Sequence, residues 1–78
     1  MLSKAIKYQE KSFNLLWDKS DEISSEEYLA LYQATHIISV KIEKAQKYGA
    51  ERLDDVFLRS LNFQAKANYF ALKKTLDE

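Results

Sequence analysis

"DKSDEISSEE", residues 18–27, separates two helical patterns, and its interpretation decides the fold. The stretch holds five acidic residues and three serines. Asp18, Ser20 and Glu22 alternate along it as calcium ligands do in an EF-hand loop. Such a loop beginning at Asp18 would need glycine at its sixth position and glutamate at its twelfth. Those positions hold Ile23 and Leu29, so we expect no metal site here.

The same residues fit the start of a helix one by one. Ser24 is a suitable N-cap, and Glu27 three residues later completes the pattern of a capping box. Ile23 before the cap and Tyr28 after it form the pattern of a hydrophobic staple. Glu26 and Glu27 also lie where the helix dipole favours negative charge. The acidic stretch therefore predicts a connection between two helices.

Three helices are predicted from the helix start and stop signals and from the helical spacing of the apolar residues. The first is expected at about residues 3–19, with Ser3 as its N-cap. The second is expected at about 25–48 and ends at Gly49, the chain's one glycine, in a left-handed conformation. The third is expected at about 52–77. Proline is absent, which agrees with long uninterrupted helices.

Each predicted helix has one main apolar arc at ~100° per residue, and we expect these arcs to form the core. In the first helix the arc comprises Leu2, Ala5, Ile6, Phe13, Leu16 and Trp17. In the second it comprises Tyr28, Leu31, Ala34, Thr35, Ile38, Ile42 and Ala45. In the third it comprises Leu53, Phe57, Leu58, Leu61, Ala65, Leu72 and Leu76.

Two short connections predict a small all-α, antiparallel three-helix bundle that forms a single domain over residues 1–78. Its first helix is short, whereas the second and third form a long hairpin. We expect the first helix to leave the far end of that hairpin partly uncovered. The residues at this end are Ile42, Ala45, Tyr48, Leu53, Val56 and Phe57.

The residues needed for common catalytic sites are missing or isolated. No cysteine is present, and His36 is the one histidine, placed by its helical angle on the solvent side. A nucleophile paired with a base cannot be assembled from these residues. One glycine is too few for a phosphate-binding loop. We therefore expect no enzyme, no catalytic residue, no cofactor and no metal.

Charge does not indicate nucleic acid or a membrane as the main partner. Twelve basic and twelve acidic side chains cancel. Lys4, Lys7 and Lys11 are notable because they share one outer arc near a helix N-terminus, where the dipole is unfavourable. They form either a solvated face or a site for an acidic partner patch. No segment reaches the ~20 apolar residues of a membrane span, and we expect a cytoplasmic protein.

Apolar residues remain after the core arcs are assigned. In the third helix they are Val56, Phe63, Ala67 and Phe70, and the first, second and fourth of these are seven residues apart. One explanation is that this helix is the most buried of the three. The other is a second interface, since burying each large side chain is worth roughly 1.5–3 kcal/mol.

These features predict a non-enzymatic protein–protein interaction module, such as a small adaptor, co-chaperone, inhibitor or immunity-type protein. Its binding residues would be the four of the third helix, together with Tyr48 and Ile42 at the open end of the hairpin. A two-fold homodimer through the same residues is also expected. The alternative is a small dimeric nucleic-acid-binding regulator, whose affinity would fall steeply with salt.

Overall fold

The computed structural model of the chain describes residues 2–49 and 52–77. It contains α1 (Ser3–Asp18), the 3-10 turn η1 (Ser20–Glu22), α2 (Ser25–Tyr48) and α3 (Asp55–Asp77). These described residues form no strand, and each helix packs against the other two. The predicted all-α three-helix bundle is confirmed.

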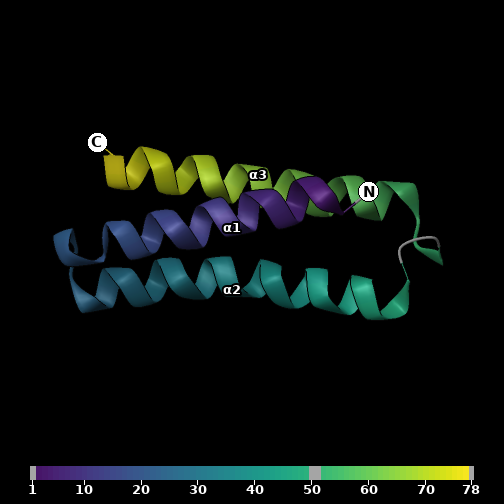
Figure 1. Cartoon of the computed structure of the whole chain (residues 1–78), viewed down its shortest axis with the longest axis horizontal. Helices are drawn as coiled ribbons and strands as arrows, with labels where there is room; N and C mark the ends of the chain where they lie inside the picture. Colours follow the sequence, from purple (N-terminus) through teal and green to yellow (C-terminus); the bar gives the residue numbers. More distant parts are fainter. Residues whose placement is uncertain (1, 50–51, 78) are drawn as a thin grey trace.

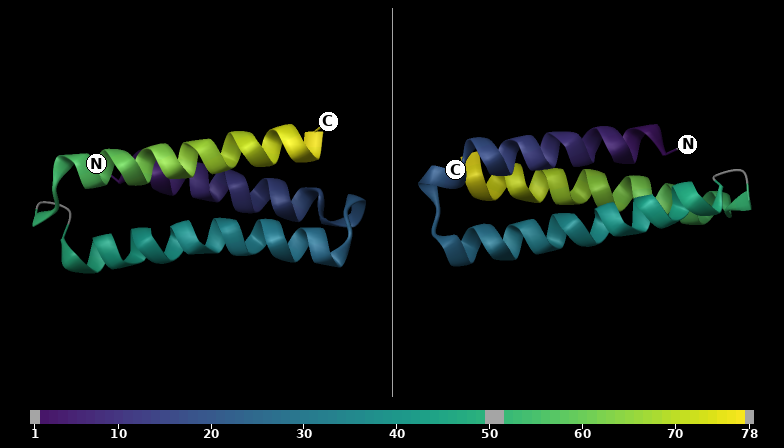
Figure 2. Two further views of the ribbon diagram at one scale, coloured as in Figure 1. Left: turned by 180° about the vertical axis from the view of Figure 1, so that it is seen from behind. Right: turned by 60° about the horizontal axis from the view of Figure 1, so that its bottom comes forward.

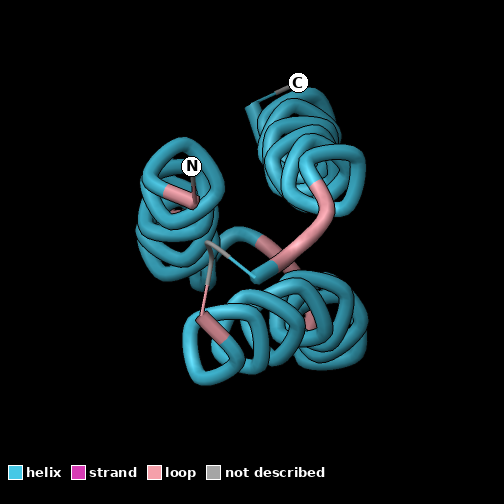
Figure 3. The backbone as a smooth tube through the Cα atoms, turned by 90° about the vertical axis from the view of Figure 1, so that its right-hand side faces the viewer, coloured by secondary structure: helices cyan, strands magenta, loops and turns pink. Residues whose placement is uncertain are grey.

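The helices run up, down and up along a long axis of 41 Å (Figure 1). The N-terminus therefore lies beside the α2–α3 connection, and the C-terminus lies beside the α1–α2 connection (Figure 2). Viewed along the axis, the three helices occupy the corners of a triangle (Figure 3). As a result α1 and α3 are parallel neighbours, although 36 residues separate the end of one from the start of the other.

Both ends of α2 are fixed by the predicted residues. The Ser24 hydroxyl oxygen accepts a hydrogen bond from the backbone N–H of Glu27 at 3.1 Å. At the other end Gly49 has a φ of 100°, and its N–H donates to the carbonyl of Ala45 at 3.1 Å. A residue with a Cβ is disfavoured at such a φ. The helix therefore begins and ends where local sequence dictates.

The start of α1 differs from the prediction that Ser3 caps it. Leu2 occupies the N-cap position, and no side chain of α1 itself caps the helix. Instead, Asn62 of α3 supplies the cap: its Oδ1 accepts a hydrogen bond from the Ala5 N–H at 3.0 Å. An unsatisfied N–H of the first turn is thus paired by a neighbouring helix. This hydrogen bond also fixes the position of α1 along its axis relative to α3.

Most of the buried apolar residues form two adjoining clusters. Small side chains allow close approach at the α1–α3 contact, where Ala5, Ser12 and Ala65 are completely buried. The first cluster comprises Leu2, Ala45, Leu58 and Leu61, and the second comprises Ala5, Ile38, Ile42 and Ala65.

Trp17 was expected in this core but is 75% exposed. Leu16 fills the last core position of α1 and is fully buried. The next residue is rotated by ~100° and so leaves the core. Trp17 lines a shallow surface groove at the α1–α2 connection together with Ile23 and Tyr28.

The far end of the α2–α3 hairpin is better covered than expected. Leu2 packs against Ala45, and Ile42 lies in the core with an exposed fraction of only 5%. The expectation that this end is uncovered was wrong for Ile42 and Ala45. The reason is that Leu2, at the start of α1, reaches Ala45 near the end of α2. Only Tyr48, Val56 and Phe57 of the expected set remain exposed.

A layer of polar side chains crosses the middle of the core and connects all three helices. Gln9 of α1 donates through Nε2 to the Thr35 carbonyl at 2.9 Å and to Ser39 Oγ at 2.7 Å. Asn68 of α3 donates through Nδ2 to Thr35 Oγ1 at 2.9 Å. In the described chain, Gln9 Oε1 and Ser12 Oγ are buried without a partner. These bonds specify one rotation of each helix about its axis.

Replacing the N-cap of α2 tests the interpretation of the acidic stretch. We expect Ser24→Ala to lower the free energy of unfolding by about 0.5–2 kcal/mol, because the Glu27 N–H loses its acceptor. Ser25→Ala is the matched control, since no cap hydrogen bond is lost. Urea unfolding followed by circular dichroism measures both. Equal stability of the two variants, or a rise in stability with calcium, would contradict the cap.

Candidate functional site

The four α3 residues predicted as a binding surface lie on the outside of the bundle. We call Val56, Phe63, Ala67 and Phe70 the outer stripe. Val56 is 70% exposed, Phe63 is 71% exposed and Phe70 is 48% exposed. The explanation that they belong to the core does not hold for Val56 and Phe63.

The helical period explains why the stripe faces outward. Leu61 and Ala65 are fully buried and point toward the other two helices. Phe63 lies midway between them in sequence and is therefore rotated by ~200° from Leu61. The core positions of α3 leave no rotation in which Phe63 is also buried.

Phe70 connects the outer stripe to α1 through aromatic contacts. Its ring centroid lies 6.2 Å from that of Tyr8 and 5.3 Å from that of Tyr69. Tyr8 and Tyr69 are themselves 5.8 Å apart. These separations are typical of favourable aromatic pairs. An aromatic cluster therefore bridges α1 and α3 beside the stripe.

Tyr48 and Ile42, the other two predicted binding residues, do not join the stripe. Tyr48 is exposed at the end of α2 and lines a separate groove between α2 and α3, with Leu53 and Phe57 among its neighbours. Ile42 packs in the core against Ala5 and the other residues of its cluster. The outer stripe alone remains as the continuous exposed part of the predicted surface.

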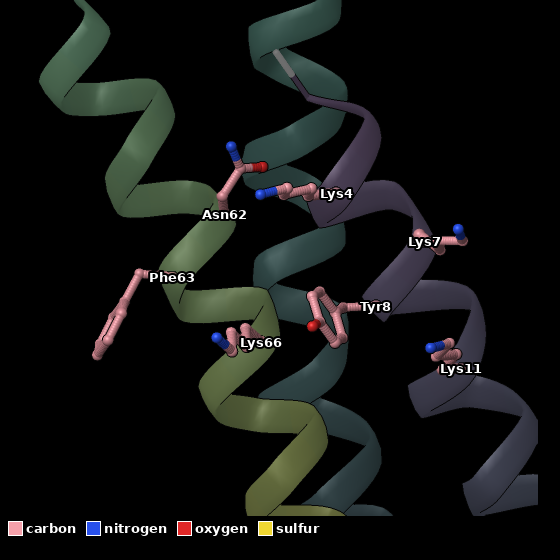
Figure 4. Close-up of a pocket in the computed structure, with 7 residues that line it drawn as sticks. All are labelled: Lys4, Lys7, Tyr8, Lys11, Asn62, Phe63 and Lys66. Atoms are coloured by element: carbon pink, nitrogen blue, oxygen red, sulfur yellow. The ribbon is translucent and has the colours of Figure 1, made fainter.

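A basic groove lies between α1 and α3, next to the outer stripe (Figure 4). We call it the lysine groove. Its lining residues are Lys4, Lys7, Tyr8, Lys11, Asn62, Phe63 and Lys66. The lysine arc of α1 is visible in the sequence, whereas the place of Lys66 beside it is not. The two parts meet only because α1 and α3 are packed side by side.

The charges of the lysine groove are not neutralised within the described chain. Ion pairs occur elsewhere, as between Arg59 and Asp55 at 2.9 Å, but none involves Lys4, Lys7, Lys11 or Lys66. The first turn of α1 also contains no acidic residue. Lys4 therefore lies where the helix dipole disfavours positive charge.

One lysine of the groove is held by aromatic rings. Lys11 Nζ lies 5.5 Å from the centroid of Tyr8 and 5.8 Å from that of Tyr69. Both distances are within the ~6 Å range of cation–π attraction. The contact places a positive charge directly beside the aromatic cluster.

The other groups considered as functional candidates are His36, the possible metal ligands and the acidic stretch around Ser24. His36 is exposed, and its ring stacks on that of Tyr32 at 5.9 Å. Within residues 2–49 and 52–77, no group of three or more histidine, aspartate or glutamate side chains could hold a metal ion. The acidic stretch around Ser24 contains the helix cap described above.

Comparison with family models, with curated proteins and with solved structures finds no match for this chain. None of its described helices combines the length and the hydrophobicity needed to cross a bilayer.

Two neighbouring residues of α3 provide a matched test of the stripe's exposure. We expect Phe63→Asp to change the free energy of unfolding by less than about 1 kcal/mol, as is usual at the surface. Leu61→Asp buries an unpaired carboxylate and should abolish folding. Circular dichroism with urea titration compares the two variants. Unfolding of Phe63→Asp to the same extent would place Phe63 in the core.

Proposed function

We propose that this chain is a non-enzymatic protein–protein interaction module of the cytoplasm, such as a small adaptor, co-chaperone, inhibitor or immunity-type protein. The observation that supports this proposal is the exposed outer stripe on a helix fixed by the core. Val56 and Phe63 are both about 70% exposed, whereas Leu58 and Leu61 behind them are buried. A partner is the simplest reason for a rigid apolar face on a small domain.

The free energy of burying apolar side chains favours binding of a partner to the outer stripe. Covering one large apolar side chain is worth roughly 1.5–3 kcal/mol. The total stability of a small domain is only about 5–15 kcal/mol. Three such side chains therefore represent a large favourable contribution that the isolated chain does not use. Aromatic anchors of this kind often dominate the energy of helix-mediated contacts.

The proposal allows two kinds of protein occupant. One is a second copy of the chain, as the seven-residue spacing of Val56, Phe63 and Phe70 suggested. In a two-fold dimer the same stripe would serve both subunits. The other is a different protein with a complementary face. Catalysis forms no part of the proposal, because the lone His36 is exposed and stacked on Tyr32.

The lysine groove gives some weight to the alternative, a small dimeric nucleic-acid-binding regulator. Four lysines that form no ion pair with the described residues are a candidate phosphate contact. The whole chain is nevertheless neutral. A salt titration separates the two functions. Affinity for nucleic acid should fall steeply with salt, whereas apolar docking on the outer stripe should persist.

Affinity capture with paired variants tests the interaction module. We expect wild type to capture at least one protein from the source cell that Phe63→Ser does not capture. Ile37→Ser is the matched control, because Ile37 is also more than half exposed but lies on α2. The captured protein is then identified, purified and titrated against all three chains by calorimetry. Equal binding to wild type and Phe63→Ser would contradict a function of the outer stripe.

A further inference from the structure

We propose that the partner of this surface is an acidic amphipathic helix of another protein. Its apolar side would lie on the outer stripe, and its carboxylates would lie over the lysine groove. This inference rests on the proposed function and specifies the chemistry of the partner.

The outer stripe and the lysine groove form one continuous surface. Phe63 belongs to both, since it is part of the stripe and lines the edge of the groove. Its ring points away from α1, whereas Tyr8 and Lys66 approach each other across the groove (Figure 4). Closer to the C-terminus of α3, Phe70 contacts Tyr8 of α1, with ring centroids 6.2 Å apart. This contact joins the stripe to the groove. An elongated partner lying along α3 would contact both parts.

The charges of this surface favour an acidic partner. Lys4, Lys7, Lys11 and Lys66 have no carboxylate partner within the described chain. The sequence from 56 to 76, which makes up most of α3, contains no acidic residue at all. The surface therefore presents apolar side chains with uncompensated positive charge along one flank. A segment that matches it is apolar on one side and acidic beside that side.

The same charges disfavour a second copy of the chain. In a two-fold contact each subunit offers the same patch. A second outer stripe would therefore bring a second lysine groove and no carboxylate from residues 56–76. Like charges placed opposite each other in an interface are unfavourable. A different, acidic protein satisfies both the stripe and the groove.

Nucleic acid fits the groove less well than an acidic helix. Binding to single strands uses aromatic faces on which bases stack. Here the ammonium group of Lys11 lies over the rings of Tyr8 and Tyr69, and Phe63 points out of the groove. The groove has no arginine. The charge of the groove is available, but the Tyr8 ring is already in contact with Lys11, Tyr69 and Phe70.

A titration with a designed probe tests the proposal on the full chain. The probe is an acetylated, amidated peptide of roughly 18 residues, with leucine along one face and glutamate on both flanks. A control peptide carries glutamine in place of every glutamate. Heteronuclear NMR of the labelled chain locates the binding site and gives the affinity for each peptide.

Two paired variants identify the contribution of the groove. The double variant Lys7→Glu/Lys11→Glu reverses two charges of the groove. Lys44→Glu/Lys47→Glu makes the same change in net charge on α2 and is the matched control. We expect the first to weaken binding of the acidic probe roughly tenfold or more, and the second to leave it almost unchanged. The glutamine peptide should bind about as weakly to wild type as the acidic probe binds to the groove variant.

The expected result is shifts of resonances in both the outer stripe and the lysine groove. Absence of shifts up to about 1 mM probe would overturn the proposal. Equal binding of the acidic and glutamine peptides would also overturn it, while leaving an apolar interaction module intact. Tighter binding of single-stranded DNA or of phosphatidylserine vesicles at the same residues would assign the surface to another class of partner. A dimeric mass of the chain alone, lost in Phe63→Asp, would assign the stripe to a second copy.

Discussion

The hydrogen bonds of Gln9 in the middle of the core determine how the three helices face one another. Gln9 reaches from α1 to the backbone and to a hydroxyl of α2, and Asn68 of α3 bonds to the same turn through Thr35. A buried polar group that loses its partner costs about 1–3 kcal/mol. Rotating any helix would break at least one of these bonds. An apolar core of leucine and alanine alone would tolerate such rotations more easily.

Two surfaces follow from this fixed arrangement. Because Asn68 must face the core, the inner face of α3 is set, and Phe63 is left on the outside. Because Ala5 and Ala65 are small, α1 and α3 approach closely enough for Asn62 to cap α1. The same approach gathers lysines of two helices into one groove. A basic flank beside an aromatic stripe is thus a consequence of core packing.

Local features of this fold could be predicted from the sequence, whereas features that depend on the offset between helices could not. The Ser24 cap and the positive φ of Gly49 are determined by residues within one or two turns. The exposed stripe also follows from the period of α3. Burial of Ile42 depends instead on how far α1 extends along α2. The cap of α1 by Asn62, and Lys66 in the groove, join residues far apart in sequence.

A partner surface on the outer stripe requires that the folded, unliganded chain keep Phe63 outside its core. Hydroxyl-radical footprinting with mass spectrometry, at low micromolar concentration, measures the accessibility of individual side chains. We predict rapid oxidation of Phe63 and protection of Leu61 and Leu72, which are almost fully buried. Protection of Phe63 to the level of Leu61 in a chain of monomeric mass would contradict it.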